Sequence, residues 1–381
     1  MDFTLTPEQK TVQEKARRAA GEVTEKAALL DRKGSFPKEI LDLWAEAGFF
    51  GLSLPKEFGG GGHDYVSYCL AQMELAQACP AAALILHLNH TLFGLAISQF
   101  GTPDQKLRYL PPVARGEVYA CFGLTEPEAG SDPSRLKTTA VKDGSEWLLT
   151  GGKNFVTSGD RARYGLVAGL TDPNQGPKGI SAFIVDLKSK GVKRGPVEEK
   201  MSLSGANSAS LIFNEVRVPA TAVLGEVNQG LKVFLTTLEG ARVGAAAQAV
   251  GIGRAVLKHA LDYARQREQF GQALTQFQNI QWKLADMATD LEAGALLTLK
   301  AAWLRDNNRP YGTAAAMAKR FATDTAMHAA LEGVQILGGY GVLKKYPMEK
   351  YFRDAKAGQI YEGTNEIMRL IIARDLIKGG I

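Results

Sequence analysis

Cysteine is scarce in this chain, and the common metal-binding patterns are missing. Its three cysteines, Cys69, Cys79 and Cys121, form no CxxC pair. Their odd number and wide spacing argue against a disulfide framework or a zinc site, and are typical of a reducing cytosol. The five histidines include no HExxH pattern. His87 and His90 could share a helix face, but a packed histidine pair is the more common arrangement. We therefore expect no metal.

Targeting segments and long basic runs are also missing. The N-terminus, Met1-Asp2-Phe3-Thr4, has no basic region and no apolar region, which argues against a signal peptide. The most apolar stretch, residues 81–100, is interrupted by two histidines, an asparagine and a glutamine. These polar groups would be costly in hydrocarbon, so we expect a buried core helix and no membrane span. The net charge of +5 is mild, and we expect a cytoplasmic protein that binds no nucleic acid.

The length of 381 residues is too great for one ordinary core and predicts several domains. The first part is helical in pattern. Thr6-Pro7-Glu8-Gln9 combines a capping hydroxyl, a proline at the first helical position and a glutamine three residues after the cap. Thr102-Pro103-Asp104-Gln105 repeats this signature, and residues 36–47 are typical of a helix ended by Gly48. We expect an N-terminal helical domain at residues 1–118.

The pattern then changes to short runs rich in β-forming residues. Asp143-Gly144 lies between two of them and is a hairpin signal. We expect a middle antiparallel, β-barrel-like domain at residues 119–224. The predicted strands are 119–124, 138–142, 147–150, 155–158, 166–170, 180–185 and 210–218.

Helical periodicity returns after Leu224. Leu231, Phe234, Leu235 and Leu238 fall at i, i+3, i+4 and i+7, which is a one-sided helical stripe. Few prolines occur before Pro347, so the helices can be long. We expect a C-terminal four-helix bundle at residues 225–381, and a chain that is mainly α with one β-domain.

One glutamate stands out because of its neighbours. Ile360-Tyr361-Glu362-Gly363-Thr364 places a carboxylate before a glycine, on a loop that leads into a helix capped by Thr364. Against a flat apolar cofactor this carboxylate would lose hydration, and its pKa would rise, which would make it a better base near neutral pH. Taken alone, the string is more typical of a solvated loop glutamate.

Four groups of residues, in order along the chain, resemble the acyl-CoA dehydrogenase family, and most closely its short-chain, butyryl-CoA branch. The first runs from Leu124 to Asp132 (LTEPEAGSD) and the second from Lys153 to Gly159 (KNFVTSG). The third is Arg267-Glu268-Gln269-Phe270-Gly271. The fourth combines Gln335-Ile336-Leu337-Gly338-Gly339 with the Glu362 string. The resemblance covers essentially the whole chain, and the order of the strings is more specific than any one of them.

The resemblance implies FAD-dependent desaturation of an acyl-CoA to a trans-2-enoyl-CoA. Glu362 would take the α-proton and the β-hydride would pass to flavin N5. The backbone N–H of Glu362 and a flavin ribityl hydroxyl would bond the thioester oxygen. Isovaleryl-type members carry their base immediately before an arginine, but here Ala241 precedes Arg242. Glu239 is the competing base. Ser131, Glu239, Arg242 and Gly363 are the implied substrate contacts.

The FAD site is also implied by the resemblance. One group of residues would follow the flavin within the subunit: Phe122, Leu124, Thr125, Ser131, Phe155, Val156, Thr157, Thr364 and Glu366. Many relatives have tryptophan where Phe155 stands, so the aromatic face is kept and the indole N–H is lost. A second group would reach the FAD of a neighbouring subunit in a homotetramer: Arg267, Phe270, Gln278, Gln335, Leu337, Gly338 and Gly339. Taken alone, Phe155 is typical of a core aromatic and Arg267 of a surface arginine.

The family also implies an electron acceptor, an electron-transfer flavoprotein, and a role in fatty-acid β-oxidation. Two alternatives remain at this point. An acyl-CoA oxidase would pass electrons to oxygen, although the chain shows no additional helical domain. A flavin-free scaffold would keep the fold and bind acyl-CoA without chemistry, although the flavin strings and Glu362 argue against it.

Overall fold

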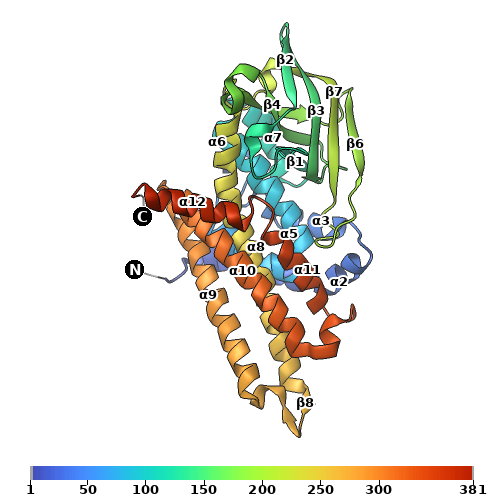
Figure 1. Cartoon of the computed structure of the whole chain (residues 1–381), viewed down its shortest axis with the longest axis vertical. Coiled ribbons are helices and arrows are strands. Elements are labelled where there is room, and N and C mark those ends of the chain that lie inside the picture. The colour runs from blue at the N-terminus through green and yellow to red at the C-terminus, as the bar shows by residue number, and fades with distance from the viewer. Residues whose placement is uncertain (1–2, 380–381) are drawn as a thin grey trace.

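The computed structural model describes residues 3–379 and shows a sheet at one end of a long array of helices (Figure 1). Both predicted capping boxes are confirmed. The side chains of Thr6 and Thr102 accept from the backbone N–H of Gln9 and Gln105, and each glutamine side chain bonds back to the cap. The N-terminal helices are α1 (Pro7–Gly21), α2 (Thr24–Arg32), α3 (Lys38–Glu46), α4 (Tyr65–Ala78), α5 (Pro80–His87), α6 (Ala96–Phe100) and α7 (Pro103–Ala114).

The most apolar helical stretch lies in the core, as expected. Helices α5 and α6 are joined by a π-helix, Leu88–Leu95, so that Pro80–Phe100 forms one continuous helical segment. Within residues 3–379 this is the one helix that is long and apolar enough to cross a membrane, and 83% of its most apolar window is buried inside the fold. A helix that is buried on all sides by protein needs no lipid to cover it.

The middle part is a seven-stranded curled sheet with the strand order β1-β4-β2-β3-β7-β6, and β5 pairs with β4. The predicted hairpin is confirmed, because β2 and β3 pair in antiparallel register around Asp143-Gly144. One expectation was wrong: β1 pairs with β4 in parallel, so the sheet is mixed. The strands are β1 (Ala120–Gly123), β2 (Thr139–Asp143), β3 (Glu146–Thr157), β4 (Tyr164–Leu170), β5 (Ile180–Asp186), β6 (Val192–Val197) and β7 (Ser208–Pro219).

Two strand predictions also need correction. Residues 147–150 and 155–158 were expected as separate strands, but both belong to β3, which bends at two register shifts against β7 and does not break. Strand β6 was not predicted. Its sequence, Val-Lys-Arg-Gly-Pro-Val, has no buried residue and carries Gly195 and Pro196, which are typical of a turn. It is an edge strand, where such residues are tolerated.

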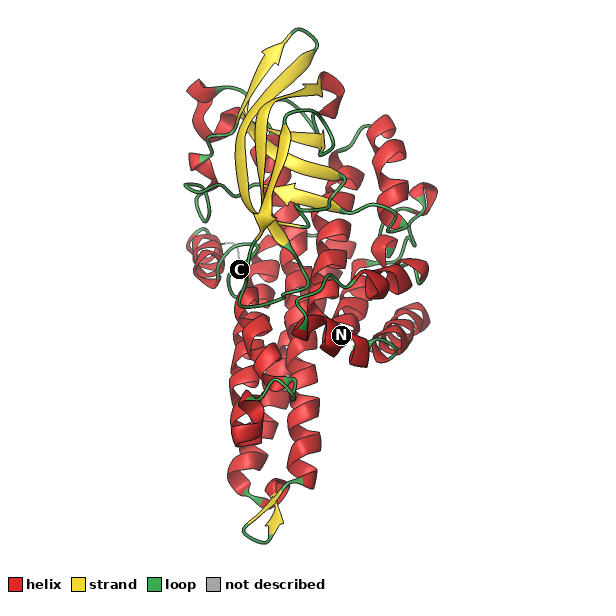
Figure 2. Cartoon of the chain, turned by 90° about the vertical axis from the view of Figure 1, so that its right-hand side faces the viewer, coloured by secondary structure: helices red, strands yellow, loops and turns green. Residues whose placement is uncertain are grey.

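The C-terminal part is built around one very long helix, α8, which runs from beside the sheet to the far end of the molecule (Figure 1). Figure 2 shows the main sheet at one end and helices along the rest of the molecule, with a small hairpin at the other end. Near its start, Phe234 packs edge-on against Phe122 of β1, with ring centroids 4.9 Å apart. Further along, Gly251 lets α4 approach closely, because a Cβ there would stand 2.4 Å from the carbonyl oxygen of Met73. The elements are α8 (Gly230–Gln266), β8 (Glu268–Gln269), β9 (Gln272–Ala273), α9 (Gln278–Asp306), α10 (Gly312–Leu337), α11 (Met348–Gly358) and α12 (Asn365–Ile377).

A buried ion pair fixes the loop that follows β1. The ammonium group of Lys153, which is fully buried in β3, lies 2.5 Å from Oε1 of Glu126. Glu126 also accepts the backbone N–H groups of Lys137 and Thr138. Burial alone would raise the pKa of Glu126, but the charge of Lys153 and these hydrogen bonds hold it below its ordinary value. Burial lowers the pKa of Lys153 to about 8.

We expect Glu126→Gln to lower the free energy of unfolding by about 3–5 kcal/mol, because it leaves a buried ammonium group without its counter-charge. Urea unfolding of the full chain measures this. The control is Glu128→Gln, whose carboxylate pairs with Lys137 on the surface at 3.1 Å and should matter far less. Equal losses in the two variants would contradict the expectation.

Candidate active site

The loop between α11 and α12 has an unusual backbone. Glu362 has a φ of 56° and Gly363 a φ of 97°, so two consecutive residues adopt the left-handed region. For a non-glycine residue this conformation costs about 1–3 kcal/mol, and such strain clusters at functional sites. The predicted cap is confirmed, because the Thr364 side chain accepts from the N–H of Ile367 at the start of α12. The turn directs the Glu362 side chain inward.

Two buried cations hold this strained loop by its carbonyl groups. Arg242 of α8 donates from Nε to the carbonyl oxygen of Glu362 at 3.2 Å. Lys319 of α10 donates from Nζ to the carbonyl oxygen of Gly363 at 2.8 Å and to Oδ1 of Asn365 at 2.9 Å. Burial lowers the pKa of Lys319 to about 8, against the opposing effect of the Glu362 charge. Arg242, expected as a substrate contact, is thus placed on the loop backbone.

The carboxylate of Glu362 is buried, with 4% of its side chain exposed. Its Oε1 lies 2.8 Å from Nε2 of His87, at the end of α5. Its Oε2 is buried and has no hydrogen-bond partner among residues 3–379. Over the same residues, the backbone N–H of Glu362 has no acceptor. The site therefore presents one tethered oxygen, one bare oxygen and one free N–H, which is the set needed to accept a proton and to bond an oxyanion.

His87 was not predicted as a site residue. The sequence placed it in a packed pair with His90, and both are indeed buried, but its partner is 275 residues away along the chain. The available signal was the helix around it: an imidazole in a buried apolar helix needs a hydrogen-bond partner. Within residues 3–379 no group of three or more His, Cys, Asp or Glu side chains could hold a metal ion, and the three cysteines are buried and free.

The carboxylate of Glu239, the competing base, faces the start of α10. A Cβ added to Gly312 would be 3.0 Å from Oε1 of Glu239. Burial raises the pKa of Glu239, and the charge of Arg242 opposes this effect. The positive end of the α10 dipole is a favourable place for a carboxylate. Helix stabilisation accounts for Glu239 without a role as a base.

The predicted flavin residues of the middle part lie on β1, on the loop that follows it and at the end of β3. Phe155 lies at a bulge of β3 with a φ of 55°, and 69% of its surface is exposed. The next residue, Val156, is buried, and Thr157 is half-buried. The N–H of Asn154 donates to the carbonyl of Thr125, which joins β3 to the loop after β1. Phe122, Leu124 and Thr125 are half-buried, and Ser131 is exposed. An aromatic ring held out by strained backbone suits a flat ligand.

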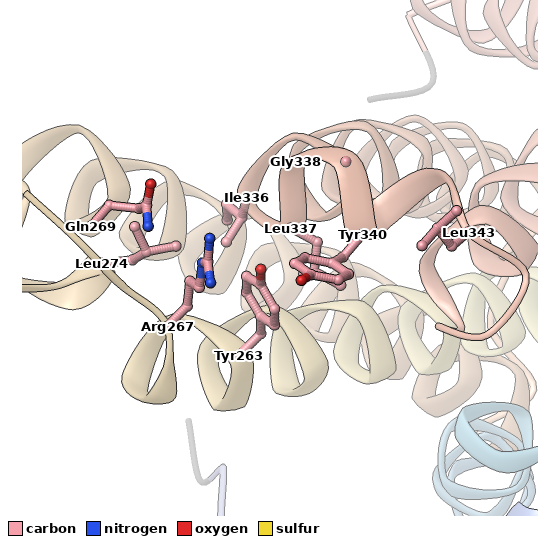
Figure 3. A pocket seen from close by; sticks show the side chains of 10 residues that line it. Tyr263, Arg267, Gln269, Leu274, Ile336, Leu337, Gly338, Tyr340 and Leu343 are labelled. Atoms are coloured by element: carbon pink, nitrogen blue, oxygen red, sulfur yellow. The ribbon is translucent and has the colours of Figure 1, made fainter.

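The second group of predicted flavin residues lies at the opposite end of the helices. A surface pocket of about 360 Å³ is formed there by the end of α8 and the end of α10 (Figure 3). Arg267, Leu337, Gly338 and Gly339 line it, whereas Phe270, Gln278 and Gln335 lie exposed outside the lining. The guanidinium group of Arg267 stands 5.8 Å from the ring of Tyr340. Within one chain, the ends of α8 and α10 that form the pocket are far from β3, which carries Phe155 (Figure 1).

Three family models match the chain in the order of its parts. The N-terminal domain of acyl-CoA dehydrogenase matches residues 6–117, the middle domain matches residues 121–216, and the C-terminal domain matches residues 228–377. Together with the helical–sheet–helical fold and the buried glutamate, these matches define an oxidoreductase of the flavoprotein class. The chain belongs to the acyl-CoA dehydrogenase family.

Similar proteins indicate which branch of the acyl-CoA dehydrogenase family the chain resembles. The chain is 39% identical to the short-chain specific acyl-CoA dehydrogenase of Clostridium acetobutylicum, over 99% of this chain and 100% of that protein. It is 41% identical to the caffeyl-CoA reductase–Etf complex subunit CarC of Acetobacterium woodii, over 92% of each chain. The structure of butyryl-CoA dehydrogenase from Megasphaera elsdenii superposes with a TM-score of 0.97 at 40% identity, over 99% of this chain and 100% of that one. The resemblance to the short-chain branch is confirmed.

We expect Lys319→Met to lower the free energy of unfolding by about 1–3 kcal/mol, because Gly363 and Asn365 each lose a buried donor. The loop that carries Glu362 should loosen, so kcat should fall as well. Thermal unfolding and steady-state rates measure the two effects. Lys300→Met, at an exposed position of α9, is the matched control. A Lys319→Met protein as stable and active as this control would contradict the role of Lys319.

Proposed function

We propose that the chain desaturates acyl-CoA thioesters between the α- and β-carbons, with Glu362 as the general base and FAD as the cofactor. The observation that carries this proposal is the bare, buried Oε2 of Glu362. A carboxylate oxygen that is shielded from water and free of hydrogen bonds is available to take a proton from carbon. The surrounding contacts hold the other oxygen and the backbone, so the free oxygen has a defined direction.

In the proposed reaction, Oε2 of Glu362 accepts the α-proton while the backbone N–H of the same residue bonds the thioester oxygen. This oxygen gains negative charge as the proton leaves, and a fixed N–H donor stabilises that charge. FAD, when bound, takes up the hydride from the β-carbon. The product is a trans-2-enoyl-CoA. Gly363 adjoins the base, and with Ser131 and Glu239 it is proposed as a substrate contact.

The residues around Phe155 fit a flavin. Its exposed ring offers a flat apolar face, and the loop held by the Lys153–Glu126 pair adds the Thr125 hydroxyl and backbone groups. We assign the isoalloxazine to Phe155, Val156 and Thr157, and the flavin chain to Phe122, Leu124, Thr125 and Ser131, with Thr364 and Glu366 at the start of α12. Exposed aromatics of this kind usually have a partner.

The pocket at the far end of the helices supports a shared site. Arg267 suits the pyrophosphate of a dinucleotide, and the two glycines permit a close approach of backbone. Since one chain keeps this pocket far from Phe155, we propose that it receives the FAD of a neighbouring subunit in a homotetramer (Figures 1 and 3). Phe270, which is 95% exposed, then gains a surface to cover it.

The substrate class and the electron acceptor follow from the relatives. The names of the Clostridium and Megasphaera proteins support a short-chain acyl-CoA substrate. The Acetobacterium relative is a subunit of a complex with Etf, which supports an electron-transfer flavoprotein as the partner. Fatty-acid β-oxidation is the role that fits these assignments.

We expect Glu362→Gln to retain FAD but to lose at least about 100-fold of the rate of flavin bleaching by butyryl-CoA, because an amide cannot accept the proton. Stopped-flow absorbance measures the bleaching, and the visible spectrum before mixing shows that the cofactor is present. Glu239→Gln is the comparison variant. If Glu362→Gln bleaches at a near-normal rate and Glu239→Gln does not bleach, then Glu239 is the base.

We expect turnover to depend on an added acceptor. Purified enzyme with butyryl-CoA in air should form little peroxide, while electron-transfer flavoprotein or a dye should restore turnover. Stoichiometric peroxide without an added acceptor would identify an oxidase instead. Absence of flavin bands in the purified protein, even after FAD is added, would favour the scaffold alternative.

A further inference from the structure

The carboxylate of Glu362 belongs to a chain of three buried polar groups. Its Oε1 contacts Nε2 of His87 at 2.8 Å, and Nδ1 of His87 contacts the hydroxyl of Tyr68, on α4, at 2.8 Å. The side chain of His87 is fully buried, and Tyr68 is 1% exposed. Both nitrogens of one imidazole are therefore used, and both partners come from other parts of the fold.

The fold makes room for this imidazole and fixes its neighbours. A Cβ on Gly244 of α8 would stand 2.4 Å from Cε1 and 2.5 Å from Nδ1 of His87, so any larger residue there would displace the ring. The Tyr68 ring is held between two others: Tyr65 at 5.0 Å and His90 at 4.2 Å, nearly parallel to it. The position of His87 is thus set by α4, α5, the π-helix and α8 together.

The hydrogen bonds define the direction of donation. Burial raises the pKa of Tyr68 well above its ordinary range, so its hydroxyl keeps its proton. When this hydroxyl donates to Nδ1, the proton of the neutral imidazole is on Nε2 and points at Oε1 of Glu362. This bond engages Oε1 of Glu362 and leaves the buried Oε2 without a partner among residues 3–379.

The other charged and titratable groups around His87 and Glu362 form their hydrogen bonds with atoms other than the carboxylate oxygens of Glu362. Arg242 of α8 and Lys319 of α10 bond the loop carbonyls and not the carboxylate. Burial lowers the pKa of His90, whose Nε2 accepts the backbone N–H of Ser53 and makes no hydrogen bond with Glu362. Thr91 bonds the backbone carbonyl of His87. Tyr65 donates to the carbonyl of Gly240, and Tyr361 lies near Gln248. Among residues 3–379, His87 is the donor that reaches the Glu362 carboxylate.

We infer that His87 is a positioning residue for the catalytic base. This inference rests on the proposed function: His87 tethers Oε1 of Glu362 and so aims Oε2 at the α-carbon, while the hydroxyl of Tyr68 fixes the tautomer of His87 that allows this. His87 does not touch the substrate. Its loss should therefore affect the proton-transfer step and leave substrate binding nearly unchanged.

The matched pair of variants is His87→Leu and His87→Gln, which are similar in size, while the amide of Gln alone can donate to Oε1. We expect His87→Leu to lower kcat about 100-fold, because a misplaced base loses that order of rate. KM should stay within about threefold of its original value. His87→Gln should recover most of the rate. His328→Gln, at an exposed position of α10, is the control for histidine replacement.

A second measurement is independent of turnover. Thermal unfolding of the FAD-loaded full chain, for His87→Leu, Glu362→Leu and the double variant, forms a cycle, because leucine at either position removes the bond that glutamine at 362 could keep. If the two side chains form a hydrogen bond, the decrease in Tm of the double variant should be smaller than the sum of the decreases in the two single variants. Additive losses would mean that the 2.8 Å contact has no energetic role and would overturn the inference.

The outcomes separate this inference from the proposed function. Full activity in Glu362→Gln would show that Glu362 is not the base and would overturn the proposed function. If Glu362→Gln is inactive but His87→Leu keeps its kcat, only the role of His87 is overturned. Equal losses of kcat in His87→Leu and His87→Gln would overturn it as well. If His87→Leu does not retain FAD, Gly244→Ala takes its place, because the added methyl group displaces the imidazole. Unchanged kcat in Gly244→Ala, with Gly294→Ala as the helix control, would overturn the inference too.

Discussion

A carboxylate buried away from water needs partners, and the site is organised around meeting this need for Glu362. An unpaired buried charge costs several kcal/mol, so the fold brings a donor to one oxygen and places two cations within reach of the loop. Arg242, His87 and Lys319 come from three different helices, and each contacts a different atom of the same short turn. The remaining oxygen is left without a hydrogen bond, and it is the atom that the proposed reaction uses as the base.

The helix boundaries were the part most open to prediction. The capping boxes at Thr6 and Thr102 and the cap at Thr364 depend on neighbours within a few residues, so local sequence was enough to place them. The sheet was harder. A bent strand such as β3 looks like two strands in sequence, and the parallel pairing of β1 with β4 depends on contacts between distant segments. Edge strand β6 carries no apolar alternation to mark it.

The residues of the candidate site also differ in how far local sequence could predict them. Glu362 was visible because its string combines a carboxylate, a glycine and a capping threonine with a family pattern. His87, Lys319 and Tyr68 carry no local mark, because their roles depend on partners that the fold brings from far along the chain. Arg242 was predicted as a substrate contact. Its hydrogen bond to the carbonyl of Glu362 could not be predicted, because only three-dimensional packing decides it.

The length of α8 has a consequence for how this protein can change over evolution. Its 37 residues span about 55 Å, and Arg242, Gly244 and Gly251 lie within about three turns of it, each fitted to a different neighbour. Insertion of a single residue would rotate everything beyond it by about 100°, which would turn these small and charged positions away from their partners. Surface loops can gain or lose residues freely, whereas this helix can accept substitutions but not a change in length.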